Sequence, residues 1–182
     1  MARAGSDRNR PALDAAAIDR LAIDYVARYA TSRAKLRAYL LRKLTERGWA
    51  GDGPPPVEPL IARLADAGFV DDRAFAEART ASLGRRGYGA HRVGMALRAA
   101  GIESADSEAA LQGAVDTAWA AGEAFARRRR IGPFAREAAD RDQRQKAMAA
   151  MMRAGHPGHV ARAFAFADPG ANPAPPDEDA AN

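Results

Sequence analysis

The side chains in this sequence that could do chemistry are mostly arginines, because few carboxylates or histidines are spaced for catalysis. Asp71 and Asp72 form an adjacent carboxylate pair. No second pair lies at a convincing spacing and no histidine is near, so a metal or acid–base site is poorly supported. A carboxylate just before a helix caps the free N–H groups of its first turn. We therefore interpret the pair as helix capping.

Histidine and cysteine patterns argue against a metal centre or a covalent catalyst. The chain has no cysteine, and His156-x-x-His159 is interrupted by Pro157 and Gly158, while His91 lies far away in the sequence. It also lacks a glycine-rich loop followed by Lys-Ser/Thr and a G-x-S-x-G motif. We expect a protein that is not an enzyme and needs no metal or cofactor.

The densest charge run is Arg127, Arg128, Arg129 and Arg130. Successive residues of a helix lie about 100° apart, so these four side chains cannot all face one partner. One interpretation is an electropositive knob that contacts phosphate or acidic side chains. The other is favourable placement of cations near a helix C-terminus. The sequence leaves both open.

Two further basic groups are candidate binding surfaces. The range 33–47 carries basic residues opposite its leucines, and this face could meet a phosphate backbone, an acidic groove or only solvent. Gly87-Tyr88-Gly89 lets the backbone approach a partner closely, and Tyr88 could stack on a base or anchor the loop. The candidate residues of these groups are Lys35, Arg37, Arg42, Lys43, Arg85, Arg86 and Arg92.

Charge and composition point to an acidic partner inside the cell. The net charge is +5, the sequence pI is about 10.1, and residues 168–182 hold four acidic side chains and no basic one. The rest of the chain therefore carries +9, which suits nucleic acid or an acidic protein surface. The alternative is an Arg- and Ala-rich composition with no function of its own. The absence of cysteine, of a signal peptide and of a long apolar run predicts a cytoplasmic protein without membrane spans.

Apolar residues recur with helical spacing throughout, and strand patterns are missing, so we predict an all-α fold. Capping residues are expected at Thr31–Ser32, Asp71–Asp72 and 104–107. The residues that we expect to face the core include Leu41, Val115 and Met152. The expected helices are about 13–29, 33–47, 57–67, 72–85, 90–100, one that follows the caps at 104–107, 115–130, 138–154 and 157–166.

Several of these helices end with the same short motif. It consists of an apolar residue, three further residues, a glycine and another apolar residue. The glycines are Gly48, Gly68, Gly101 and, in a weaker copy, Gly155. Glycine after a helix adopts the left-handed conformation, and the next residue folds back onto the last turn. We thus expect contacts between Trp49 and Leu44, Phe69 and Leu64, and Ile102 and Leu97. Three glycines are 53 or 54 positions apart, which predicts tandem helical units.

The predicted organisation has five segments. They are a disordered basic arm (1–12), three three-helix repeats (13–70, 71–113 and 114–167) and a disordered acidic tail (168–182). A repeat this small buries its apolar faces by stacking on its neighbours.

Three segments resemble the RecX family of bacterial recombinase regulators: "SRAKLRAYLLRKLTERGW" (32–49), "LIARLADAGFVDDRAFAEAR" (60–79) and "GYGAHRVGMALRAAGI" (87–102). The closest match runs from Gly68 to Ala76. The resemblance makes Gly68, Phe69, Asp71, Asp72 and Phe75 a structural signature.

The resemblance implies three tandem three-helix repeats in an elongated, curved array. It also implies a monomer that binds the RecA filament and restrains strand exchange and the coupled ATP hydrolysis. Such a protein would act in homologous recombination and DNA repair, as part of the SOS response. Some members also bind DNA, single- or double-stranded. Two other functions stay open from the residues alone: a stand-alone DNA-binding protein of helix-turn-helix type, and a helical scaffold.

Overall fold

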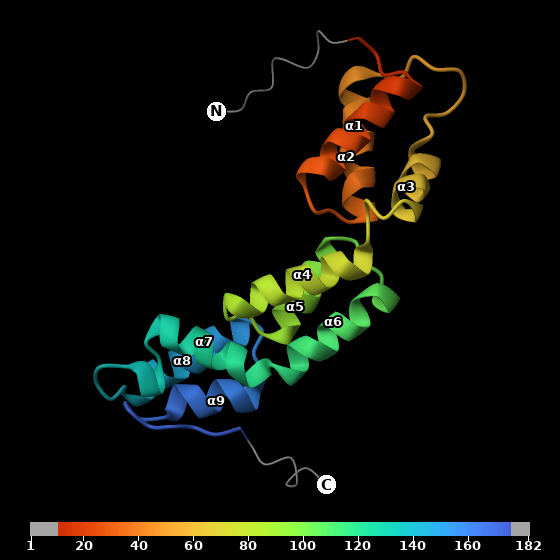
Figure 1. Ribbon diagram of the computed structural model, residues 1–182. Helices are drawn as coiled ribbons and strands as arrows, with labels where there is room; N and C mark the ends of the chain where they lie inside the picture. Colours follow the sequence, from red (N-terminus) through yellow and green to blue (C-terminus); the bar gives the residue numbers. More distant parts are fainter. Residues whose placement is uncertain (1–10, 176–182) are drawn as a thin grey trace. The chain divides into compact units, whose positions relative to one another are not determined.

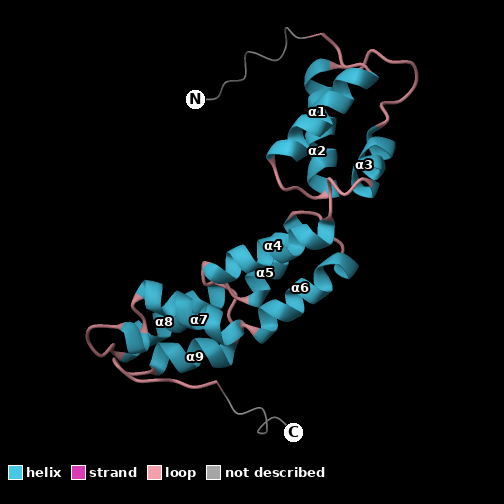
Figure 2. Cartoon of the chain, in the orientation of Figure 1, coloured by secondary structure: helices cyan, strands magenta, loops and turns pink. Residues whose placement is uncertain are grey.

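The computed structural model describes residues 11–175, and every regular element in this range is helical (Figure 1). The all-α prediction is confirmed. Loops join the helices, and the longest, residues 48–56, connects α2 to α3 (Figure 2). The elements are α1 (Ala15–Arg28), α2 (Arg33–Arg47), α3 (Val57–Asp66), α4 (Asp72–Arg85), α5 (Ala90–Ala99), α6 (Ser104–Asp116), α7 (Ala118–Arg129), the 3-10 helix η1 (Gly132–Phe134), α8 (Arg141–Arg153) and α9 (Gly158–Phe166).

Capping side chains explain where α2 and α4 begin. Ser32 precedes α2, and its hydroxyl accepts a hydrogen bond from the Lys35 N–H at 3.2 Å. Asp71 precedes α4, and its carboxylate accepts from the Ala74 N–H at 2.9 Å. Both contacts satisfy N–H groups that have no partner inside the helix. The predicted capping by Ser32 and by the aspartate pair is confirmed.

The expected caps at 104–107 are wrong for α6. The helix already begins at Ser104, after Glu103, which makes no side-chain capping bond. The Ser107 hydroxyl donates instead to the Ser104 carbonyl inside the helix, at 3.2 Å. A serine inside a first turn has this local alternative to capping.

The described residues fall into two compact units. One contains the residues up to Phe75 together with Ala100–Ile102, and the other contains Ala76–Ala99 and the residues from Glu103 onward. We call them the first and second unit. The predicted division into three repeats stays a prediction.

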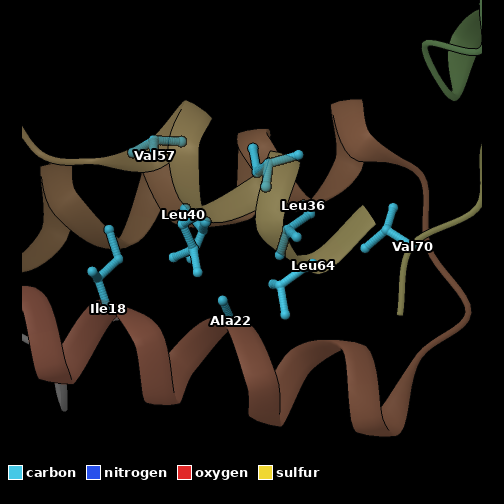
Figure 3. Close-up of a cluster of buried hydrophobic side chains, with 9 residues drawn as sticks. Ile18, Ala22, Leu36, Leu40, Val57, Leu64 and Val70 are labelled. Atoms are coloured by element: carbon cyan, nitrogen blue, oxygen red, sulfur yellow. The ribbon is translucent and has the colours of Figure 1, made fainter. Parts of the chain in front are cut away.

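The core of the first unit lies among α1, α2 and α3 (Figure 3). Ile18 of α1, Leu40 of α2 and Leu64 of α3 point toward one another in this cluster and are at most 4% exposed. Before α1, Leu13 bonds to the chain around Trp49, since its N–H donates to the Gly48 carbonyl at 3.0 Å. Burial of these apolar side chains is the main stabilising contribution to the unit.

The core of the second unit is centred on α7, α8 and α9. Phe125, Met151 and Phe164 are at most 4% exposed, and the ring of Trp119 lies 4.9 Å from that of Phe164. A Cβ on Gly122 would lie 2.4 Å from Val160 Cγ1, so glycine allows α7 to pack closely on α9.

Three residues that the helical pattern placed inside are exposed. Leu41, Val115 and Met152 are 49%, 55% and 51% exposed. The preceding residue is buried in each case, and the next residue along a helix lies about 100° further around its axis. The buried positions are Leu40 and Met151, which the helical pattern also placed inside, and Ala114.

The glycine stop after α3 has the expected backbone but a different side-chain arrangement. Gly68 has φ +77°, and the Phe69 N–H donates to the Leu64 carbonyl at 2.9 Å. The Phe69 side chain is 63% exposed, while Val70 is 2% exposed and joins the core. The fold-back is therefore made by the backbone, and the predicted packing of the Phe69 side chain is wrong.

The other two good copies of the motif agree with the expectation in part. Gly48 and Gly101 have φ of +80° and +71°, but the ψ of 172° at Gly48 is extended and not left-handed helical. Trp49 and Leu44 both pack against the core of the first unit. Ile102 and Leu97 are both buried. Direct contact of Trp49 with Leu44 and of Ile102 with Leu97 stays a prediction.

The predicted arm and tail lie partly outside the described residues. Residues 1–10 and 176–182 are outside. Within the described part, the Pro11 carbonyl accepts two hydrogen bonds from the Arg47 side chain. Asp168, the first residue of the predicted tail, forms an ion pair of 2.7 Å with Arg144 of α8.

Candidate functional site

Three arginines and a tyrosine line one cavity of the second unit, which we call the arginine groove. Its volume is about 370 Å³. Arg79 and Arg86 come from α4 and the residue after it, and Arg92 comes from α5. The lining residues are Arg79, Leu83, Arg86, Tyr88, Arg92, Met95, Ala96 and Ala99. No carboxylate is among them, so the groove presents positive charge beside apolar surface.

The Tyr88 ring lies close to two of these guanidinium groups. The Arg86 and Arg92 side chains lie 5.5 and 5.8 Å from the centre of its ring. These distances are typical of cation–π contacts. In the described part of the chain, the arginines of the groove have no carboxylate within ion-pair distance. Their charges are therefore available to an anion such as a phosphate group or an acidic side chain.

The helix stop after α4 positions Tyr88. Gly87 has φ +69°, its N–H donates to the Gly84 carbonyl, and the Tyr88 N–H donates to the Leu83 carbonyl at 3.0 Å. This pair of bonds is a Schellman motif. A Cβ on Gly87 would also lie 2.8 Å from the Phe125 backbone nitrogen. Glycine is thus required both by the backbone angle and by the close approach of α7.

The turn between α4 and α5 (residues 86–89, the α4–α5 turn) is bonded to the turn between α8 and α9 (residues 154–157, the α8–α9 turn). The Gly89 N–H donates to the Ala154 carbonyl at 3.0 Å, and the His91 N–H donates to the Gly155 carbonyl at 3.3 Å. A Cβ on Gly89 would lie 2.2 Å from the Gly155 carbonyl oxygen. The two turns meet backbone to backbone, and this contact holds one side of the arginine groove.

His156 joins the same two turns. Its Nε2 lies 3.1 Å from the Gly87 carbonyl oxygen. A carbonyl only accepts, so Nε2 carries the proton and donates. The buried Nδ1 has no hydrogen-bond partner in the described part of the chain. Burial lowers the pKa of His156, and the bond to Gly87 opposes this shift.

The run Arg127–Arg130 does not form one surface. Arg127 pairs with Glu123 at 2.6 Å and covers the Phe134 ring, while Arg129 lies 5.6 Å from the Phe125 ring. Arg128 donates to the Arg86 carbonyl and so contacts the α4–α5 turn. Arg130 ends α7 with a left-handed φ of +55°. Of the four, Arg128 is the one bonded to a residue of the groove.

The basic residues of α2 largely have partners within the first unit. Arg37 makes two hydrogen bonds to Glu58 of α3, and its Nε lies 2.5 Å from Oε1. This contact raises the pKa of Arg37 and lowers that of Glu58. Lys43 pairs with Glu46 at 2.6 Å, and the Arg42 guanidinium lies 3.8 Å from the same carboxylate. Lys35 lies over the Phe75 ring at 4.9 Å.

Sequence reasoning therefore identified part of this site. The structure brings together Arg86, Arg92 and Arg128, while Arg85 is exposed and does not line the groove. Arg79 and Met95 were missed. Arg79, Leu83 and Arg86 are spaced i, i+4 and i+7, so one face of α4 carries all three, and that spacing was the available signal. Binding by any of these residues stays a prediction.

The aspartate pair of the signature serves two helices. Asp71 caps its own helix α4, as described above. Asp72 is 6% exposed, and its carboxylate accepts from the Arg33 N–H in the first turn of α2 at 2.8 Å. The pair thus links the starts of α2 and α4. Phe75, another residue of the signature, lies under the Lys35 ammonium group.

Two further kinds of feature are absent from the described residues. No cluster of three or more histidine or acidic side chains in residues 11–175 could hold a metal ion. No helix of this range is long and apolar enough to cross a membrane.

Comparisons with known proteins match the segment that carries the site and most of the chain. Residues 71–111, which contain the entire arginine groove, match the family model described as "RecX, second three-helix domain". The "Regulatory protein RecX" of Halorhodospira halophila (strain DSM 244 / SL1) is 31% identical over 144 residues, 79% of this chain and 86% of that protein. The protein of the same name from Myxococcus xanthus (strain DK1622) is 27% identical over 163 residues, 84% of this chain and 86% of that protein.

The fold agrees with a solved structure. The "Crystal structure of RecX from Lactobacillus salivarius" superposes with a TM-score of 0.57 over 79% of this chain and 89% of that chain, at 18% identity. That likeness shows a shared fold. Because the Halorhodospira relative is similar over most of both chains, this chain belongs to the RecX family.

Proposed function

We propose that this chain is a non-enzymatic regulator of the RecA recombinase that acts as a monomer in the cytoplasm. It binds the RecA filament and lowers its ATPase and strand-exchange activity. Membership of a family whose relatives are named regulatory protein RecX supports this proposal.

The single observation that carries the proposal is the arginine groove. Three guanidinium groups line it without any carboxylate, and the backbone contact between the two turns holds its shape. Arginine forms paired hydrogen bonds with carboxylate and phosphate groups. The groove therefore suits acidic side chains of the filament or phosphates of the DNA that the filament holds.

Contact at more than one place would strengthen binding. Basic side chains of α2, several of them paired with Glu46 or Glu58, form the candidate surface of the first unit, and the arginine groove forms that of the second. Weak contacts on one chain combine into tighter binding when both can be made at once. A regulator held across filament subunits would hinder filament extension or the motions that accompany ATP hydrolysis.

The test measures DNA-dependent ATP hydrolysis by RecA against increasing amounts of this chain. The groove variant is Arg86→Glu with Arg92→Glu. The control is Arg136→Glu with Arg141→Glu, which makes the same change in net charge at exposed arginines of the second unit. Loss of one charge-assisted contact is worth about 1.5–3 kcal/mol, so the half-inhibiting concentration should rise at least about tenfold for the groove variant. The control should behave like the parent chain.

Two outcomes would contradict the proposal at different levels. Unchanged ATPase and strand exchange at saturating parent chain would refute regulation of RecA. Regulation that both variants weaken equally would show that general positive charge, and not the groove, makes the contact.

Stand-alone duplex DNA binding is the second candidate, because α4 and α5 are joined by a short turn with arginines on both sides. A helix-turn-helix reader of this kind distinguishes base sequences in the major groove. Binding measured on duplexes of different sequence and equal length would then differ. Equal, salt-sensitive binding to all of them would exclude this candidate.

A further inference from the structure

A second cavity, in the first unit, is lined by three tyrosines and two arginines. We call it the tyrosine pocket. It lies between α1 and α2, and its volume of about 410 Å³ is in the range of ligand-sized clefts. The lining residues are Leu21, Asp24, Tyr25, Arg28, Tyr29, Tyr39 and Arg42.

The aromatic rings of the pocket are arranged as a stacking surface. Tyr25 and Tyr39 are stacked, with ring centres 4.2 Å apart and planes 17° apart. The Tyr29 ring is tilted against Tyr25 at 5.2 Å and is 58% exposed. Tyr25 and Tyr39 also cover the core of the first unit, whereas Tyr29 is not among the side chains packed on that core. Core packing therefore accounts for two of the rings, whereas the Tyr29 ring packs on Tyr25 and is largely exposed.

The charged groups around the rings favour an anionic ligand. Arg28 and Arg42 line the pocket with one carboxylate, that of Asp24. The Arg42 guanidinium lies 5.7 Å from the Tyr39 ring centre. Burial raises the pKa of Tyr39, so its hydroxyl stays protonated and adds no negative charge. Asp24 offsets part of this positive charge, and Arg42 also lies 3.8 Å from the Glu46 carboxylate. Two guanidinium groups still face one carboxylate in the lining, so a phosphate is favoured over a cation.

We propose that the tyrosine pocket binds one nucleotide of single-stranded nucleic acid, with its base stacked on Tyr29 and its phosphate beside Arg28 and Arg42. Aromatic side chains combined with basic groups bind single strands in this manner, without strong sequence preference. Bases inside a duplex are already stacked on their neighbours, so the pocket selects the single-stranded form. This inference goes beyond the proposed function, because binding of a single strand here does not require regulation of RecA.

The test measures fluorescence anisotropy of a short labelled oligothymidine with the full chain and its variants. Tyr29→Ala removes the exposed ring, and Tyr29→Phe restores it without the hydroxyl. Ile23→Ala is the matched control, because Ile23 is a large exposed apolar residue of α1, the helix that Tyr29 follows, and lies outside the pocket. Loss of one base–aromatic stack weakens binding about 5- to 140-fold. Tyr29→Ala should lose affinity in this range, whereas Tyr29→Phe and Ile23→Ala should stay within about twofold of the parent chain.

Two further ligands show what the pocket recognises. An abasic strand of the same length keeps the phosphates and lacks the bases, so the parent chain and Tyr29→Ala should bind it equally weakly. A hairpin duplex should be bound equally by both chains. The proposal would be overturned if the parent chain and Tyr29→Ala bound oligothymidine with equal affinity. It would also be overturned if Tyr29→Ala lost as much affinity for the duplex as for oligothymidine.

Filament binding by the same variants separates this pocket from the regulatory function. If Tyr29→Ala keeps its DNA affinity but no longer binds the RecA filament, the occupant is a protein and the nucleotide proposal is refuted. If Tyr29→Ala loses oligothymidine affinity while the parent chain leaves RecA activity unchanged, the pocket stands and the regulatory proposal fails.

Discussion

Substituting Gly89 by alanine should separate the α4–α5 turn from the α8–α9 turn. The added Cβ would lie 2.2 Å from the Gly155 carbonyl oxygen and 2.5 Å from the His156 backbone nitrogen. Ordinary contacts of a Cβ begin at 3.4 Å. Both opposing atoms belong to the backbone, so no side-chain rotation can relieve the overlap. The turns must move apart by about 1.2 Å.

The cost follows from the hydrogen bonds that this movement breaks. They are Gly89 N–H to Ala154, His91 N–H to Gly155, and His156 Nε2–H to Gly87. A hydrogen bond contributes about 0.5–1.5 kcal/mol net, so loss of the three lowers the free energy of unfolding of the second unit by about 1.5–4.5 kcal/mol.

Denaturant unfolding of the full chain can measure this loss in one unit alone. Trp119 packs on Phe164 in the second unit, and Trp49 packs in the first. In a Trp49→Phe background, tryptophan fluorescence therefore reports the second unit. Gly113→Ala is the matched control, because a Cβ at that position of α6 meets nothing within 4 Å. Alanine is a better helix former than glycine, so the control should be about 1 kcal/mol more stable than the parent chain.

The reasoning would be refuted if Gly89→Ala unfolded at the same denaturant concentration as Gly113→Ala. That result would mean that the turns are not held together by the backbone contact. Hydrogen exchange gives a second measurement, since the amides of Gly89 and His91 should lose protection in Gly89→Ala and keep it in Gly113→Ala.

Three other substitutions test local features. Arg130 ends α7 in the left-handed conformation, which strains a residue that carries a Cβ. Arg130→Gly should therefore stabilise the second unit by about 1 kcal/mol in denaturant unfolding. Destabilisation would contradict this backbone strain. Burial lowers the pKa of His156 in the folded chain, so the unfolded chain is the first to protonate this histidine as the pH falls below about 6.5. The free energy of unfolding should therefore drop by up to about 1.4 kcal/mol per pH unit. His156→Gln should flatten that pH dependence, and an unchanged slope would assign it to other groups. Asp72→Ala should cost about 1–2 kcal/mol through loss of the bond to Arg33, and Asp72→Asn, which keeps an acceptor oxygen, should cost less; equal losses would indicate that charge matters more than the bond.

Local signals made the helices predictable. The bounds of α2 and α4 match the expected ranges because Ser32, Asp71 and the glycine stops lie within a few residues of the ends that they determine. The start of α6 was misplaced because the serines of 104–107 are good caps in isolation but lie inside the helix. Phe69 was misplaced because the fold-back after Gly68 satisfies the backbone and leaves the side chain outside.

The site was less predictable because it depends on contacts between distant residues. His156 and Gly87 are 69 positions apart, and no periodicity connects them. The pairing of Arg37 with Glu58 spans 21 positions and joins two helices. Charge runs in the sequence therefore show where arginines are numerous, whereas the groove depends on which of them the fold brings together.

The most direct test of the regulatory role is co-sedimentation of the full chain with RecA filaments, with and without DNA. The account predicts that the parent chain sediments with the filament, that Arg86→Glu with Arg92→Glu remains in the supernatant, and that Arg136→Glu with Arg141→Glu sediments like the parent chain. A parent chain that stays in the supernatant at every RecA concentration, or a groove variant that sediments as well as the parent, would contradict it.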